Sequence, residues 1–141
     1  PEQDLRRAIQ DDDFEKFLHS AAVRQRLVSI TMANRKIYIG WILETMDPTN
    51  ERKHITLLPL FSGYRDENGK TELTTRYDEI YAKMNAEEAT ADSNIGHVTP
   101  DDFRVVLPVS RVESANYFDL DVYRRFNPET DLFLSPGAGN P

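Results

Sequence analysis

The sequence predicts a mainly β fold: a small barrel of short strands that carries a helix at each end. Three observations favour this fold. From Leu27 onward, apolar and polar residues alternate with the period of two that half-buried strands show. Turn signals at Asn34-Arg35 and Asn68-Gly69 separate the apolar runs. Helical patterns flank the strands, and 141 residues, 39% of them hydrophobic, suffice for one domain with a core.

The first 26 residues form the predicted N-terminal helical segment. Leu5, Ala8 and Ile9 share one helical face, and a second apolar series begins at Phe14. Residues 11–13 are three aspartates that interrupt the pattern, so we expect one of them to cap a second helix. A metal cluster is the alternative for these carboxylates, but consecutive acids on a helix point in different directions. We therefore expect an amphipathic helix that lies on the sheet.

Residues 27–116 form the predicted barrel. The expected strands cover residues 27–33, 36–45, 54–65, 71–77, 103–107 and 111–115. The second and third strands are apolar on both faces, whereas the interior of a barrel needs only one apolar face. A helix of the same chain or a neighbouring subunit must cover the other face. Pro59 lies within the third strand and marks an edge or a bulge, because proline cannot donate to a ladder.

An acidic insertion over residues 78–102 interrupts the predicted barrel. It carries seven acidic residues against one basic residue, and the whole chain has a net charge of −7. We predict a mobile surface loop with one helical turn around Ile80–Met84. A C-terminal helix is expected over residues 117–127, followed by a tail over residues 128–141 whose last part, SPGAGNP, is expected to be disordered.

Several classes of function are excluded or disfavoured by composition. The chain has no Cys, which rules out disulfides, thiolate metal sites and Cys nucleophiles. Its three histidines, His19, His54 and His97, are isolated, and no catalytic or phosphate-binding motif occurs. We therefore predict no catalytic, cofactor or metal site. The pI of about 4.9 argues against an ordinary basic nucleic-acid binder.

The location of the protein is predicted from what the chain lacks. No apolar run approaches the roughly 20 residues of a membrane span. We expect no membrane contact from this segment and a cytoplasmic location. Residue 1 is Pro rather than Met, so we also expect the chain to be a fragment of a longer protein.

Residues 28–42 (VSITMANRKIYIGWI) resemble the first half of the Sm motif, with apolar alternation, a turn, a basic residue and then Tyr38-Ile39-Gly40. Residues 105–112 (VVLPVSRV) resemble the second half in rhythm. The resemblance implies a strongly bent five-stranded SH3-like barrel that has Gly40 at the bend of its second strand. The family's RNA-contacting Asp-x-x-Asn loop is replaced here by residues 46–53, and its Arg-Gly pair by Pro108-Val109.

A bacterial group shares the K-x-Y-x-G-W and L-P-L-x-S-G-Y-R-D patterns of this chain, and that resemblance implies no activity. Sm-type barrels commonly join their edge strands into rings. We therefore predict a non-enzymatic module that assembles as a homo-oligomer, for which a ring is one form, or that binds a ligand or protein partner. The first alternative is an Sm-like RNA-binding protein, and a weaker one is an enzyme whose site is assembled across subunits. The candidate structural or interface residues are Tyr38, Gly40, Trp41, Gly63, Tyr64 and Arg65. The turn from Ser62 to Asp66 is expected to bind an anion or, more commonly, to hold an Arg65–Asp66 ion pair.

Overall fold

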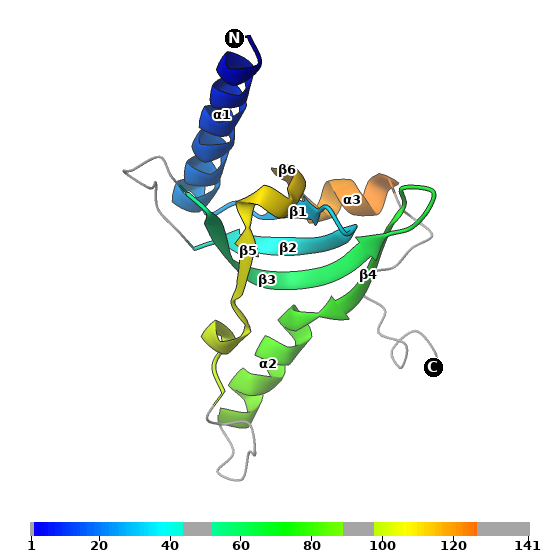
Figure 1. Ribbon diagram of the computed structural model, residues 1–141. Helices are drawn as coiled ribbons and strands as arrows, with labels where there is room; N and C mark the ends of the chain where they lie inside the picture. The colour runs from blue at the N-terminus through cyan, green and yellow to red at the C-terminus, as the bar shows by residue number, and fades with distance from the viewer. Residues whose placement is uncertain (1, 44–51, 89–97, 127–141) are drawn as a thin grey trace.

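The computed structural model describes residues 2–43, 52–88 and 98–126, and the side chains of 13–43, 52–86 and 98–125. These residues form a mainly β fold of six antiparallel strands with three α-helices and two short 3-10 helices (Figure 1). The elements in chain order are α1 Glu2–Arg24, β1 Val28–Met32, β2 Lys36–Ile42, β3 His54–Arg65, β4 Thr71–Arg76, α2 Tyr77–Glu88, η1 Pro100–Phe103, β5 Val105–Pro108, η2 Val109–Arg111, β6 Val112–Tyr117 and α3 Leu120–Phe126.

The sheet has the strand order β4-β3-β2-β1-β6, and β5 pairs with β3 as well. The 12-residue strand β3 pairs with two strands one after the other: its first residues pair with β5, and its last residues pair with β4. Pro59 lies between the two pairings, so its missing N–H costs neither of these ladders a hydrogen bond. Among the described strands no ladder joins β5 to β6, so the sheet is not closed. The count of five strands that the Sm resemblance implies is wrong: the sheet has six strands, as many as the strand-like segments that the sequence pattern predicts.

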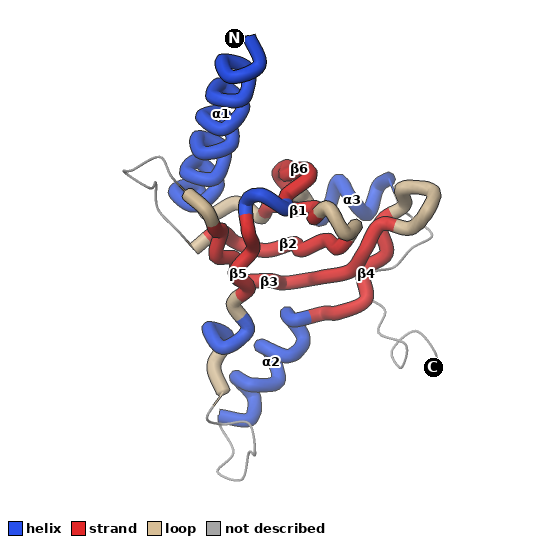
Figure 2. Tube along the Cα trace, in the orientation of Figure 1, coloured by secondary structure: helices blue, strands red, loops and turns tan. Residues whose placement is uncertain are grey.

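Two apolar cores lie against the sheet. The first contains Leu18 and Ala21 of α1 together with side chains from β1, β2, β3 and β5. The second contains Ile37, Ile39 and Phe61, with Phe118 of the segment before α3 packed against them. The expectation that elements of the same chain cover the second apolar face of the strands is thus met in part. Figure 2 shows α1 and α2 leaving the sheet in opposite directions.

The predicted break at residues 11–13 is wrong, because α1 is one continuous helix of 23 residues. Residues 2–24 contain neither Pro nor Gly, so three helix-tolerant aspartates do not interrupt the helix.

The prediction of a loop is also wrong over the first part of the acidic insertion, where α2 runs to Glu88. Met84 is buried, and the Tyr81 hydroxyl donates a 2.6 Å hydrogen bond to the carbonyl oxygen of Pro59. Phe103 of η1 packs edge-on against the rings of Tyr77 and Tyr81. These contacts hold α2 against β3 and η1. Residues 98–102, the end of the predicted loop, include the start of η1 at Pro100. Residues 89–97 and the predicted tail (128–141) lie outside the described residues, as do residues 44–51.

Candidate functional site

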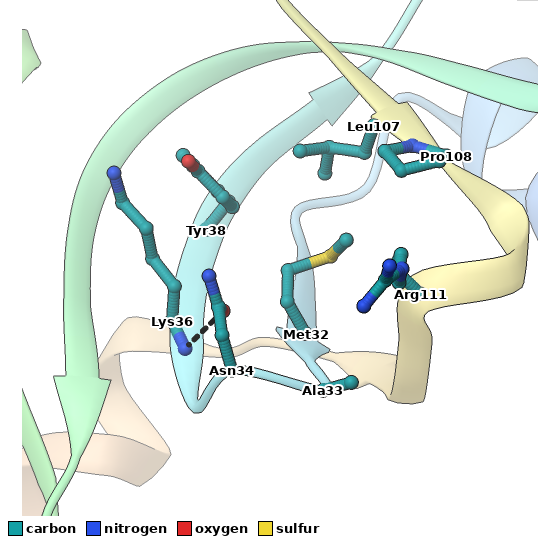
Figure 3. Close-up of a pocket in the computed structure, with 8 residues that line it drawn as sticks. All are labelled: Met32, Ala33, Asn34, Lys36, Tyr38, Leu107, Pro108 and Arg111. Atoms are coloured by element: carbon teal, nitrogen blue, oxygen red, sulfur yellow. Dashed lines mark hydrogen bonds between the residues drawn. The ribbon is translucent and has the colours of Figure 1, made fainter.

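A pocket of about 310 Å³ lies where the β1–β2 turn meets the corner formed by β5 and η2 (Figure 3). Its lining comes from four elements and one turn. The lining residues are Met32, Ala33, Asn34, Lys36, Tyr38, Leu107, Pro108 and Arg111.

Local hydrogen bonds fix the β1–β2 turn at one wall of the pocket. Arg35 has a φ of 72°, and its N–H donates to the carbonyl oxygen of Met32 at 2.9 Å. The side-chain oxygen of Asn34 accepts a 3.0 Å bond from the N–H of Lys36, in the manner of an Asx-turn. The Ala33 N–H donates to the carbonyl oxygen of Arg111 at 2.7 Å, which ties this turn to η2 across the pocket. Both walls are therefore held in place by backbone geometry.

One cation of the pocket, Lys36, stands beside an aromatic ring. The Lys36 nitrogen lies 5.2 Å from the centre of the Tyr38 ring, within cation–π range. The neighbouring Tyr38 hydroxyl is the main cause that raises the pKa of Lys36 above its usual 10.5. Lys36 is therefore fully charged at neutral pH, and its ammonium group is held on the β2 side of the pocket.

The second cation, Arg111, lies on the other side. The β6 residue that follows it, Val112, pairs with Met32 of β1, and Lys36 begins β2 on the opposite edge of β1. Two strand spacings therefore separate the backbones of Lys36 and Arg111, or roughly 10 Å. Figure 3 shows the same arrangement, with Lys36 and Tyr38 on one side, Arg111 on the other and Met32 between them.

The floor between the two cations is apolar. Met32 and Leu107 are 6% and 4% exposed and belong to the first core, against which Tyr38 also packs. None of the eight lining residues is an Asp, Glu or His. Lys36 and Arg111 can only donate hydrogen bonds, and the Asn34 oxygen already accepts one bond from the Lys36 N–H. The site is thus a small, partly apolar recess with two separate positive groups.

Of the six residues predicted as candidates, Tyr38 alone lines this pocket. Gly40 and Gly63 occupy places where the register of β3 shifts against β2 and β4, and a side chain at either would collide with backbone atoms of the neighbouring strand. Trp41 is half-buried and pairs with Leu58. Gly40 and Gly63 therefore serve the packing of the sheet.

Tyr64 and Arg65 belong to the β3–β4 hairpin. The Tyr64 hydroxyl donates to a Glu72 carboxylate oxygen at 2.7 Å, and Arg65 donates to the Gly69 carbonyl and the Thr31 hydroxyl. The carboxylate of Asp66 accepts the N–H groups of Asn68 and Lys70 instead of pairing with Arg65. The predicted Arg65–Asp66 ion pair is therefore wrong: both residues stabilise the hairpin through other partners.

Asn34, Lys36 and Arg111 were not predicted as site residues. The turn at Asn34-Arg35 is visible in the sequence as a turn signal, and residues 108–110 lie between two expected strands. Their meeting depends on the pairing of β1 with β6, which joins segments about 80 positions apart. A sequence pattern carries no direct signal for such a pairing.

Across the ranges 2–43, 52–88 and 98–126, no three His, Asp or Glu side chains come together as metal ligands. Within the same ranges, no helix has both the length and the apolar character that crossing a membrane requires. Comparisons with protein families, with curated proteins and with solved structures found no match to this chain. The Sm resemblance therefore stays a prediction.

Proposed function

We propose that the chain is a non-enzymatic binding module and that its pocket takes an anionic ligand. One observation carries this proposal: Lys36 and Arg111 are both cationic, and no carboxylate lines the pocket with them. A charged hydrogen bond to such a group contributes more than a neutral one. The lining has no His, Asp or Glu, the side chains that most often serve as general bases, which favours binding over catalysis.

The test is an NMR titration of the ¹⁵N-labelled chain with phenyl phosphate, which combines a ring with an anion. The amide signals of Ala33, Asn34, Lys36 and Arg111 are expected to shift together. The double variant Lys36→Gln/Arg111→Gln should weaken binding about tenfold, because the anion then has no cation from which it can accept a charged hydrogen bond. Arg125→Gln on α3 removes a positive charge elsewhere and should leave binding unchanged. Shifts scattered over the surface, or equal effects of the two variants, would contradict the proposal.

We also propose that the module assembles with copies of itself through β5. This strand pairs with β3 on one edge, and Val106 in its middle is 60% exposed. The unpaired edge of such a strand can form a ladder with another chain, and an exposed apolar side chain beside it can be buried in that contact. Light scattering should give a mass above 16.3 kDa for the parent chain and that of a monomer for Val106→Lys. Val122→Lys, which changes an exposed valine on α3, is the matched control. A parent chain that is monomeric would sink this part of the proposal.

A bent, SH3-like arrangement of the sheet is part of the same proposal. Strands β6 and β5 are the first and the last strand of the path β6-β1-β2-β3-β5. Only the three residues of η2 separate these two strands in the chain. So short a connection brings the two ends of the path together, which supports a sheet that curls toward a barrel.

RNA is the alternative ligand, because phosphates would suit Lys36 and Arg111 and a base would stack on Tyr38. The net charge of −7 disfavours a long polyanion. Fluorescence anisotropy with a labelled oligouridylate separates the alternatives. An RNA-binding protein should lose affinity steeply between about 50 and 200 mM salt, through counterion release. We expect no such binding.

A further inference from the structure

We propose that the ligand of the pocket is an elongated organic dianion with one anionic group at each end and an apolar, ring-sized middle. This inference rests on the proposed function and names the chemical class of the ligand. It follows from where the two cations stand, what lies between them and how large the pocket is.

The two cations are placed to meet two separate anionic groups. Lys36 and Arg111 belong to strands on either side of β1, so their backbones are roughly 10 Å apart. The Lys36 ammonium group does not lean over β1, because its contact with Tyr38 keeps it on the outer side of the pocket. A single carboxylate bound at Arg111 would leave Lys36 without a partner in the complex.

The hydrogen-bonded frame opposes a change in this separation. The Ala33 N–H and the Arg111 carbonyl oxygen are 2.7 Å apart, and the pairing of Met32 with Val112 continues the same contact. Side-chain rotation alone therefore decides whether both cations reach one anion. For Lys36 that rotation means losing the Tyr38 contact, which favours the two-ended ligand.

The surface between the cations suits a ring. Met32 lies between them, and Leu107 and Pro108 complete the apolar lining. A thioether adapts its shape to flat ligands and makes favourable contacts with aromatic edges. The amide NH2 of the Asn34 side chain adds a neutral donor beside Lys36. The volume of about 310 Å³ lies at the lower end of small-molecule sites, so it suits one ring with its substituents.

Charge balance points to the same class. Two cations without a carboxylate partner in the lining are neutralised by a ligand of charge −2. No hydrogen bond or ion pair from the Arg111 side chain to another described residue is present in the structure, so its guanidinium group keeps its donors for a ligand.

Terephthalate and benzoate make a direct test, because they share a ring and differ by one carboxylate at the far end. Isothermal titration of the full chain should give a Kd for terephthalate about tenfold lower than that for benzoate. Lys36→Met and Arg111→Met keep apolar stems and remove one charge each. Each variant should bring the terephthalate affinity down to the benzoate level of the parent chain, while Arg125→Met should change neither affinity.

The benzoate arm gives the sharper result. Benzoate can use only one cation at a time, so either single variant should retain most of its benzoate affinity, within about twofold. If the parent chain binds terephthalate and benzoate with equal affinity, the dianion inference is wrong, whatever the variants show. The same holds if both variants lose benzoate binding about tenfold, since that result means that the cations converge on one anion.

The outcomes also separate this inference from the function on which it rests. If benzoate binds at the pocket as tightly as terephthalate, the anion-binding function stands and the two-ended ligand is wrong. If neither compound shifts the amide signals of Ala33, Asn34 and Arg111, both proposals fail. Lys36→Arg restores the charge on the same strand and should recover terephthalate binding, which shows that the loss in Lys36→Met is one of charge.

Discussion

Gly40 lies in the middle of the sheet, where β2 has neighbours on both sides. It pairs with Val28 on β1 and with Pro59 on β3, directly after the register shift at Ile39. A Cβ atom at this position would lie 2.8 Å from the Pro59 Cα and closer still to the Leu58 carbonyl oxygen. Real Cβ atoms do not approach backbone atoms so closely, so any side chain here forces β2 and β3 apart.

The size of the effect follows from two opposing contributions. Overpacking against a rigid neighbour costs about 3 kcal/mol, at the upper end of the usual range. Replacing Gly by Ala restricts the unfolded chain and returns about 0.5–1 kcal/mol. Gly40→Ala should therefore lower the free energy of unfolding by about 2 kcal/mol, and Gly40→Val, with two further methyl groups, by about 3 kcal/mol.

Urea unfolding followed by far-UV circular dichroism measures this loss and avoids the fluorescence of the neighbouring Trp41. Gly69→Ala is the control, because Gly69 has a φ of +80° and no heavy atom lies within 4 Å of the place that its Cβ atom would take in the turn. That variant should lose only about 1 kcal/mol, from backbone strain. If Gly40→Ala unfolds at the midpoint of the parent chain, or loses less than Gly69→Ala, the close approach of β2 and β3 is refuted.

Three further predictions concern Trp41, Arg52 and Tyr81. Iodide should quench native Trp41 clearly less than it does in the urea-unfolded chain, because the side chain is half-buried, and equal quenching would contradict its packing. Arg52→Met should destabilise by about 2 kcal/mol, because it removes the two bonds, of 2.7 and 2.9 Å, that Arg52 donates to the Glu15 carboxylate, which is 13% exposed. The double variant with Glu15→Leu should recover most of that loss in urea unfolding, and a double variant as unstable as the single one would argue against a buried charge. Burial raises the pKa of Tyr81 from 10.0 to about 12, so its stabilising effect is complete below pH 10 and lost as the pH rises toward 12. Unfolding titrations at several pH values across this range should show that the free energy of unfolding falls less steeply with pH in Tyr81→Phe than in the parent chain. Equal slopes in the two chains would count against the burial of the hydroxyl.

The strands could be predicted because their residues carry strong local signals. The expected bounds of β3, His54 to Arg65, coincide with the observed ones, and β4 differs by one residue at its end. Apolar alternation and the Asn68-Gly69 turn act over a few positions, so they are readable without knowledge of the fold. The second apolar face of β2 likewise indicated that another element must cover it, and Phe118 does so.

The elements that were missed depend on contacts between distant segments. The helix α2 is largely polar, and Met84 is its one buried side chain among those described, so its amphipathic pattern is weak. Its stability comes from Phe103 and from the bond to Pro59, which no local pattern reports. The pocket was missed for the same reason, since Lys36 and Arg111 meet only through the pairing of β1 with β6.

That pairing also has a consequence for the order in which the chain folds. Val28 of β1 pairs with Tyr117 of β6, about 90 positions further along, and a loop of this length closes slowly. All five residues of β1 are buried in the finished sheet. During synthesis this strand can pair with β2 at once, but its other edge stays open until almost the whole described chain has left the ribosome. Until then, the open edge of a strand that is buried in the folded protein can pair with other nascent chains. Pairing with β6 closes this edge of β1 and removes the risk of aggregation there.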